Sequence, residues 1–333
     1  MLTFIALLVT SLSIALAGGL ASAAEFTPAS VNDASISGRS DLRGAALLKL
    51  QVLLDRARAS PGQIDGRNGE NTRKAIKAYQ RLSGFKMNGR LDARLAQKLA
   101  ADAEPVLVPY RVGEEDVAGP FVERVPEDYR EKAELKRLAY TGATELLAEK
   151  FHMSEDLLRK LNPGASFDQA GAEIIVANVR QGGLGAPIGR LEVNAREQTV
   201  TAYGREDTIL AIYPATVGSG ERPSPSGEFK VTGIARDPIY YYDPRNQLRG
   251  VDVEEKLKIP PGPNNPVGTV WIDLSSKGYG IHGTPEPDKV SKTASHGCIR
   301  LTNWDANELA GSVKKGTPVA IVGAASRSQP PAR

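Results

Sequence analysis

Short runs of alternating apolar and polar residues between positions 189 and 323 constrain the fold of this chain most strongly. Several have the length and pattern of strands: RLEVNA, QTVTAY, TILAIYPATVG, GEFKVTGIA, VGTVWIDLS and GYGIHG. The segment PPGPNNP cannot adopt regular structure, because each proline removes a backbone donor and fixes φ. One helix is expected over 304–314, where a Thr-x-x-Asp pair can cap its start. The sequence therefore predicts a mostly β domain over 187–323.

The chain before this domain is helical in pattern. At 333 residues it is long enough for two or three domains. Over 41–100, apolar residues recur at steps of three and four, and loops rich in Gly and Asn separate three expected helices. Residues 137–179 predict helix, turn, helix, loop and strand, with Ser154 as the N-cap of the second helix. The stretch 101–136 carries four prolines and is expected to be a connector.

The first 24 residues, MLTFIALLVTSLSIALAGGLASAA, have no charged side chain and end in small residues with an Ala-x-Ala pattern. They predict a secretory signal peptide over 1–24, although no Lys or Arg lies near the start, and an uncleaved membrane anchor is the alternative. No later segment approaches the roughly 18 apolar residues that a spanning helix needs. We expect an exported protein with no membrane contact after cleavage, a flexible lead over 25–40 and a disordered tail over 324–333.

The balance of charge excludes one class of partner. The chain has 42 Lys and Arg against 39 Asp and Glu, a net charge of +3. Nucleic-acid binding needs a concentrated basic surface, and single-strand binding also needs aromatic platforms, whereas aromatic residues are 6% of this chain. We therefore expect no nucleic-acid partner.

Cys298 is the only cysteine in the chain. It cannot form an internal disulfide, so in an oxidising compartment it must be buried or used. His296 lies two residues before it, and His282 ends a predicted strand sixteen residues before it. An imidazole can accept the thiol proton, and consecutive N–H groups at Gly297 and Cys298 can bind an oxyanion. Arg300 adds a fixed positive charge suited to a carboxylate.

Two other interpretations of these residues remain. His282, His296 and Cys298 could bind zinc through two nitrogens and a sulfur, or the cysteine could be a small buried side chain in a tight loop. No carboxylate stands at ligand spacing, and neither H-E-x-x-H nor C-x-x-C occurs. We predict no metal and no cofactor, and we expect the third histidine, His152, to be structural.

The β domain resembles the L,D-transpeptidase (YkuD-type) family. The matching segments are IHGTPEP, RPSPSGEFKVT and the complete Ser-His-Gly-Cys-x-Arg motif at 295–300. The resemblance implies a β-sandwich in which Cys298 is the nucleophile and His282 is its base, oriented through the Gly283 carbonyl. It implies that His296 lies beside the thiolate and supports the acyl intermediate.

The same resemblance assigns the remaining residues of the loop. The N–H groups of Gly297 and Cys298 would form the oxyanion hole. Arg300 would hold a substrate carboxylate or stabilise the loop. Ser295 would fix the loop by hydrogen bonding or act in catalysis, and Gly283 and Gly297 can be glycine for backbone reasons alone.

Two accessory modules show further resemblances. Residues 41–100 resemble the peptidoglycan-binding domain 1 family on Leu-Gln at 50–51, IDGRNGENTRKAIKAYQ, Gly-Phe at 84–85 and Asn-Gly at 88–89; a generic three-helix module is the alternative. Residues 137–179 resemble a LysM module on ELLAEKFHMSEDLLRKLNPG and Gly171. The usual leading GDTL is replaced by TGAT, so a structural remnant is the alternative to a glycan binder. The expected fold class is multidomain α+β.

The resemblances imply a reaction and its partners. The enzyme would cleave the bond before the terminal D-alanine of a peptidoglycan tetrapeptide stem, form a thioester and transfer the acyl group to a neighbouring stem as a 3→3 crosslink. Glycan strands would be bound by the accessory modules, carbapenems would acylate the cysteine, and the protein would act in the periplasm. Water or a protein lysine as acceptor, and a non-catalytic wall-binding protein, remain alternatives.

Overall fold

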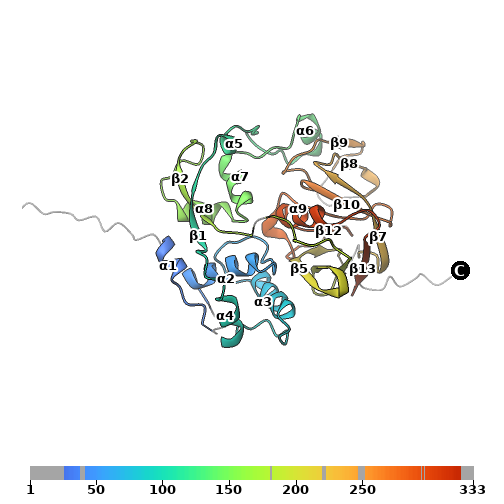
Figure 1. Cartoon of the computed structure of the whole chain (residues 1–333). Coiled ribbons are helices and arrows are strands. Elements are labelled where there is room, and N and C mark those ends of the chain that lie inside the picture. The colour runs from blue at the N-terminus through green and yellow to red at the C-terminus, as the bar shows by residue number, and fades with distance from the viewer. Residues whose placement is uncertain are drawn as a thin grey trace, which may run out of the picture.

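The computed structural model describes the chain over residues 26–37, 42–180, 182–219, 223–246, 252–293, 295 and 297–323. The predicted signal peptide, the predicted tail and His296 lie outside these residues. The helical N-terminal half and the β-rich C-terminal half lie side by side (Figure 1). In the part of the chain that is described, no helix has the length and apolar character needed to cross a membrane.

The three helices predicted over 41–100 are present as α2 (Gly44–Arg56), α3 (Glu70–Leu82) and α4 (Ala93–Leu99). Two buried glutamines fix the loops between them. The Gln51 side chain accepts from the Gly66 N–H at 2.8 Å and donates to Asp65 at 3.0 Å. Gln80 accepts from the N–H groups of the second loop in the same way, at 2.9 Å. Burying an amide is favourable here because both of its ends are hydrogen-bonded.

The lead before this module is not a flexible segment where it is described. Helix α1 (Pro28–Asn32) begins at a capping box between Thr27 and Ser30, and Val31 is fully buried. The Asn32 side chain accepts from two consecutive N–H groups, those of residues 106 and 107, at 2.9 Å. The polar composition of this stretch suggested flexibility, but its polar residues are used as caps and bridges.

The second module contains α7 (Ala143–Lys150), α8 (Glu155–Leu161) and strand β2 (Glu173–Ala177), in the predicted order. Ser154 caps α8 by accepting from the Leu157 N–H at 3.1 Å. The structure adds β1 (Leu107–Arg111), which pairs antiparallel with β2. The boundary predicted at 137 is therefore too late, because part of the expected connector is a strand of this module.

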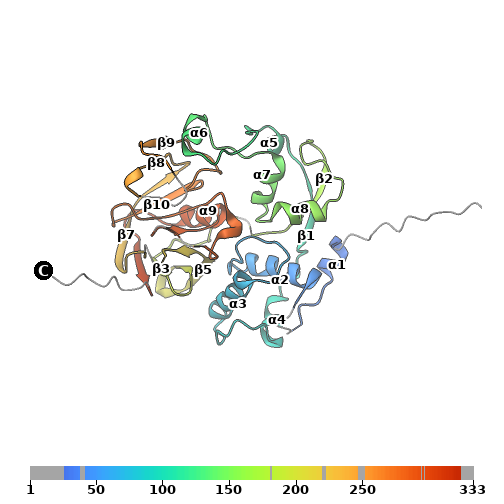
Figure 2. The same cartoon turned by 180° about the vertical axis from the view of Figure 1, so that it is seen from behind.

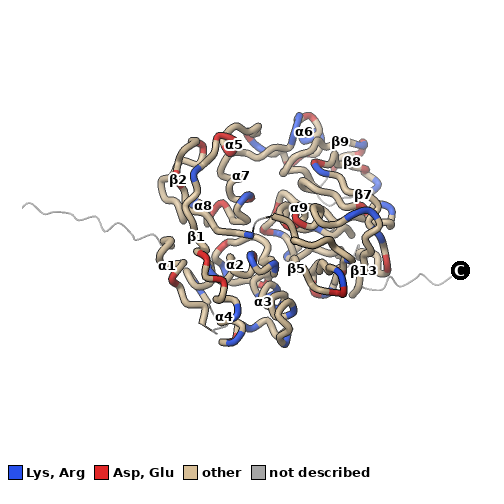
Figure 3. The backbone as a smooth tube through the Cα atoms, viewed as in Figure 1, with Lys and Arg blue, Asp and Glu red and all other residues tan. Residues whose placement is uncertain are grey.

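The two N-terminal modules share one hydrophobic core. Leu48 and Leu53 of α2 belong to the same buried cluster as Met153, Leu157 and Val176 of the second module. The rest of the connector contains two short helices, α5 (Glu114–Val117) and α6 (Tyr129–Glu134). Lys and Arg are interspersed with Asp and Glu over both halves of the molecule (Figure 3).

The C-terminal domain is built on a nine-stranded sheet of order β5-β4-β3-β13-β7-β10-β11-β12-β6 within the described residues. Its strands are β3 (Arg190–Asn194), β4 (Thr199–Tyr203), β5 (Ile209–Pro214), β6 (Thr216–Val217), β7 (Gly227–Arg236), β10 (Val270–Leu274), β11 (Gly280–His282), β12 (Ile299–Arg300) and β13 (Pro318–Val322). The two end strands, β5 and β6, are separated by one residue along the chain, so the sheet must curl until its edges adjoin. A separate hairpin pairs β8 (Tyr240–Tyr242) with β9 (Leu257–Ile259).

Helix α9 (Asn303–Ser312) follows β12 at the predicted place and packs on β10, β11 and α7. Thr302 caps it by accepting from the Asp305 N–H at 3.2 Å. Seen from behind, α9 again lies between the second module and the sheet (Figure 2). The helix therefore connects the loop that carries the cysteine to the helical N-terminal half of the molecule.

A cluster of buried charges joins the modules. Arg180, which follows β2, pairs with Asp55 of α2 and with Asp305 and Glu308 of α9. Burial acts to raise the pKa of Asp55, but the charges of Arg180 and His152 hold it down to about 2. His152 lies 3.0 Å from Asp55 through Nδ1, a structural position.

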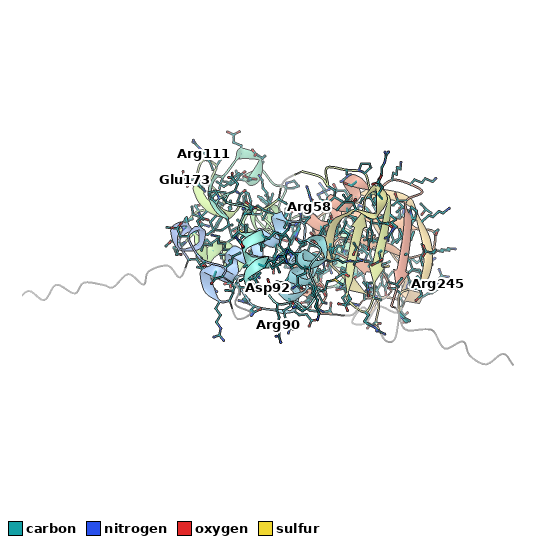
Figure 4. The ribbon with its side chains drawn as sticks, turned by 60° about the horizontal axis from the view of Figure 1, so that its bottom comes forward. Arg58, Arg90, Asp92, Arg111, Glu173 and Arg245 are labelled. Atoms are coloured by element: carbon teal, nitrogen blue, oxygen red, sulfur yellow. The ribbon has the colours of Figure 1, made fainter. Side chains whose placement is uncertain are left out.

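The surface around this junction is shown with side chains in Figure 4. Arg58 lies where the first module meets the C-terminal domain, and it pairs with Glu308 at 3.2 Å. Nearby, the backbone of Ser60 donates to Ile212 of β5 at 3.0 Å. Arg111 and Glu173, which are paired in the β1–β2 register, lie at the far end of the second module.

Candidate active site

Parallel pairing of β11 with β12 brings the predicted site residues together. Ile281 is paired with Ile299, and His282 is paired with Arg300. Cys298 directly precedes β12, so it lies beside the strand that carries His282. The Cys298 Sγ is 3.7 Å from the Gly278 carbonyl oxygen. The sheet register thus places the predicted nucleophile and base on neighbouring strands.

The environment of His282 keeps its imidazole neutral. Its Nδ1 lies 2.7 Å from the Gly283 oxygen. A carbonyl oxygen only accepts, so Nδ1 must carry the proton and Nε2 keeps its lone pair. The ring stacks on Trp271 at 5.4 Å between centroids. Burial, helped by the charge of Arg300, lowers the pKa of His282 to about 3, which leaves the imidazole neutral at working pH.

The Gly283 carbonyl is itself held by packing that the sequence did not predict. A Cβ at Gly283 would overlap the Asn303 Oδ1, so only glycine allows this approach. Asn303 is the first residue of α9, and its Oδ1 accepts from the Thr269 N–H at 3.2 Å. Its Nδ2 donates to both carboxylate oxygens of Glu149, at 3.0 and 3.2 Å. A residue of the second module therefore supports the loop that orients His282.

The loop before Cys298 is fixed by two serines. Ser295 is buried, and its Oγ donates to the Cys298 carbonyl at 2.7 Å. The Gly297 N–H donates to the same Oγ at 3.4 Å, a long hydrogen bond. Ser224 donates to the Gly297 carbonyl at 2.6 Å. Ser224 belongs to the RPSPSGEF segment, which could have signalled its place, but it was not singled out as a site residue.

Gly297 requires glycine for two reasons. Its φ is +108°, a backbone conformation that other residues rarely adopt, and a Cβ there would lie 2.8 Å from Cε1 of Tyr279. The loop can therefore present its N–H groups only with glycine at this position.

The Cys298 thiol is protonated at rest. Burial raises its pKa above the ordinary value, and the Gly280 backbone and Arg300 oppose that rise. With His282 neutral as well, the resting pair consists of a thiol and an imidazole without net charge.

Arg300 contributes a cation that the described residues leave without an anion. Its Nε is buried and has no hydrogen-bond partner among them. A buried donor without a partner costs about 1–3 kcal/mol, and a bound carboxylate would remove that cost. Among the described residues no group of three or more His, Cys, Asp or Glu is placed to hold a metal ion. His296 lies outside these residues, so the zinc interpretation is not tested.

Two segments of the chain match known families. Residues 188–321 match the L,D-transpeptidase catalytic domain, and residues 43–99 match a putative peptidoglycan binding domain. Together with the β domain, they define an acyltransferase joined to a putative peptidoglycan-binding module.

Curated relatives extend this result. The putative L,D-transpeptidase YkuD of Bacillus licheniformis is 33% identical over 179 residues, which are 53% of this chain and 92% of that protein. The putative L,D-transpeptidase YqjB of Bacillus subtilis is 34% identical over 121 residues, which are 35% of this chain and 61% of that protein. The probable L,D-transpeptidase ErfK/SrfK of Escherichia coli is 26% identical over 196 residues, which are 55% of this chain and 60% of that protein. The chain thus spans about three fifths of the latter two relatives. It belongs to the L,D-transpeptidase family.

Solved structures similar to the chain include L,D-transpeptidase 1 of Mycobacterium tuberculosis. It is 21% identical, with 40% of this chain and 60% of that chain covered and a TM-score of 0.30. The catalytic domain of the Enterococcus faecium L,D-transpeptidase is 24% identical. The match covers 40% of this chain and 96% of that chain, with a TM-score of 0.32.

Proposed function

We propose that this enzyme forms 3→3 crosslinks in peptidoglycan. Cys298 attacks the carbonyl of the L-centred third residue of a tetrapeptide stem, and the bond to the terminal D-alanine breaks. The thioester that results is then attacked by an amine of a neighbouring stem, which restores the thiol. The observation that carries the proposal is the neutral His282 imidazole, with its free Nε2 lone pair, on the strand next to the Cys298 thiol.

Each proton has a carrier in this scheme. His282 accepts the thiol proton as sulfur attacks and gives it to the departing D-alanine amine. In the second half of the reaction, His282 accepts a proton from the incoming amine and returns it to the departing sulfur of Cys298. Because both groups are neutral at rest, charge develops only during attack. No cofactor is required.

The developing oxyanion needs donors, and the loop offers two. We assign this role to the N–H groups of Gly297 and Cys298. The Gly297 hydrogen bond to Ser295 is long, 3.4 Å, so exchanging it for an oxyanion loses little. Arg300 binds a carboxylate of the stem, and His296 supports the acyl intermediate. Ser295 and Gly283 act by holding the loop and His282.

We propose that the N-terminal modules keep the enzyme on the wall, which raises its local concentration at stem peptides. The first module has a cavity of about 550 Å³ lined by polar groups that include Asn68, Arg73, Asn88 and Arg90. The second is proposed to be a LysM-like glycan binder. Family membership implies an extracellular or periplasmic location, and we propose the periplasm, with export by residues 1–24. We propose module limits of 41–100 and 187–323.

The test is incubation of the wild-type protein and Cys298→Ala with disaccharide-tetrapeptides, followed by mass spectrometry. Dimers with loss of one D-alanine are expected from the wild type alone. Tripeptides would instead show that water is the acceptor. Crosslinking by Cys298→Ala would refute the nucleophile, and loss of activity with a chelator but not with a thiol alkylator would favour zinc. A carbapenem should add its mass to the wild type and not to Cys298→Ala.

A further inference from the structure

Helix α3 of the first module contacts the C-terminal domain just before the cysteine loop. It packs along β5, and both views of the ribbon show the two elements side by side (Figures 1 and 2). Near the start of α3, the buried Asn71 side chain donates from Nδ2 to the Val290 carbonyl at 3.1 Å. Three positions later, the Lys74 ammonium donates to the Ser291 Oγ at 2.5 Å. One helix therefore holds two consecutive residues that precede the loop.

The backbone at Ser291 needs contacts of this kind. Its φ is +64°, in the left-handed region that residues other than glycine rarely adopt. Such a conformation costs free energy and persists only where the surrounding contacts determine it. Lys74 binds the side chain, Asn71 binds the preceding carbonyl, and the Thr216 Oγ1 accepts from the Ser291 N–H at 2.8 Å. Two of these three contacts come from the first module.

Strand β6 connects Ser291 to the cysteine loop. Thr216 of β6, which binds Ser291, is paired with Arg300 in the sheet. Directly after β6, the Gly218 carbonyl accepts from the Ser295 N–H at 3.0 Å. The chain therefore contacts β6 or its end at 291, at 295 and at 300, and the cysteine lies between the last two contacts. Helix α3 fixes the first of these three points.

The face of α3 that contacts the loop is separate from the face that lines the cavity of the first module. Thr72, Arg73 and Ile76 line that cavity, whereas Asn71 and Lys74 do not. With about 3.6 residues per turn, Asn71 and Lys74 share the other side of the helix. Support of the loop can therefore be removed by substitution without changing these three cavity residues.

We propose that α3 of the first module positions the cysteine loop for turnover, with Asn71 and Lys74 as positioning residues that act through Val290 and Ser291. The inference rests on the proposed function and extends it, because it gives the wall-binding module a part in the reaction itself. That part does not depend on contact with the wall. A module that served only as a tether would leave turnover of a soluble fragment unchanged.

The first experiment measures D-alanine release from a soluble disaccharide-tetrapeptide by the full-length enzyme. Lys74→Met and Asn71→Leu should each lower kcat about tenfold or more, because a displacement of about 1 Å can cost about a hundredfold. KM should stay within about twofold, since neither residue binds the substrate. The control is Lys77→Met, which removes a cation of the same helix. Lys77 is 44% exposed and forms an ion pair with Glu197 at 3.6 Å, whereas Lys74 is 12% exposed. The control should keep the wild-type kcat.

A double-mutant cycle distinguishes positioning from a general loss of stability. Ser291→Ala removes the hydroxyl that Lys74 contacts and should lower kcat by a similar factor. In the Ser291→Ala background, Lys74→Met should have little further effect, because both changes break the same contact. Effects at two independent sites would instead multiply. Thermal melting checks that each variant is folded at the assay temperature.

A second measurement needs no substrate. The N–H groups of Ser291 and Ser295 are hydrogen-bonded to Thr216 and to the Gly218 carbonyl. Their hydrogen exchange should be faster in Lys74→Met than in the wild type and in Lys77→Met, because local opening sets the exchange rate of such groups. Exchange in β10, in the middle of the sheet, should be the same in all three proteins.

Three results would each overturn the inference: a kcat of Lys74→Met equal to that of Lys77→Met, losses that multiply in the double mutant, or unchanged exchange at Ser291 and Ser295. The proposed function fails by a different result, namely a wild-type enzyme that releases no D-alanine from the tetrapeptide. In that case the exchange measurement still decides whether α3 fixes the loop, so the two failures are separately observable.

Discussion

Glu149 gives the sharpest test of how the second module meets the catalytic domain. Its carboxylate accepts from the Tyr140 hydroxyl at 2.8 Å and from Asn303 at 3.0 and 3.2 Å. Burial raises its pKa from 4.5 to about 7, although these hydrogen bonds oppose the rise. We predict that Glu149→Gln, which can keep both contacts, removes a pH dependence of stability.

The sign and size of this pH dependence of the free energy of unfolding follow from proton linkage. Between pH 4.5 and about 7 the folded protein keeps a proton on Glu149 that the unfolded chain has released. The free energy of unfolding must therefore fall as pH rises through this window. One pKa unit corresponds to about 1.4 kcal/mol, so the full difference is about 3 kcal/mol. This is an upper limit, because Glu149 lines a cavity of about 650 Å³ that admits water.

The assay is urea unfolding near pH 5 and near pH 8, followed by the fluorescence of Trp271 and Trp304. Relative to Glu149→Gln, the wild type should lose up to about 3 kcal/mol of stability between the two conditions. Glu155→Gln, which removes an exposed carboxylate of α8, is the control and should retain the wild-type dependence. If the wild type and Glu149→Gln lose stability equally, the carboxylate does not titrate in this window and the reasoning fails.

Further predictions concern the cysteine loop and the buried charges. Alkylation of Cys298 by iodoacetamide should still be accelerating above pH 9, and Arg300→Gln should slow it at any given pH, because Arg300 lowers the thiol pKa; a plateau near neutral pH would contradict this. Gly297→Ala should reduce kcat at least about a hundredfold by displacing an oxyanion donor, and D-alanine release within twofold of wild type would refute it. Arg180→Met should cost about 3–5 kcal/mol in urea unfolding, because it leaves buried carboxylates unpaired; a loss below about 1 kcal/mol would mean that the cluster is hydrated.

The loop before α9 and the start of that helix were predictable because their signals are local. The motif at 295–300 places nucleophile, donors and cation within six positions, and the cap at Thr302 marks the helix that follows. The pairing of His282 with Arg300 is not local, but His282 ended a recognisable strand. Residue types and spacing were sufficient to bring His282 and the loop together, and the catalytic roles assigned to them stay predictions.

The errors in the sequence analysis have physical causes. Prolines made 101–136 look like a connector, yet Pro109 lies within β1, a strand of a two-stranded ribbon. Proline is tolerated on edge strands because one side of such a strand needs no ladder donor. The contact between Glu149 and Asn303 joins residues 154 positions apart in the chain, and no local pattern encodes such a contact.

The contacts of α9 argue that the N-terminal modules are part of the catalytic architecture. If they were only tethers, their contacts with the catalytic domain would be exposed ion pairs, each worth about 0–1 kcal/mol. Instead, Arg180 binds two carboxylates of α9 within a buried cluster, and Glu149 binds Asn303 at the first residue of that helix. Asn303 packs against Gly283, whose carbonyl fixes the proton on His282. We expect that displacing the second module would release α9 from one side, and that the orientation of the His282 ring would change with it.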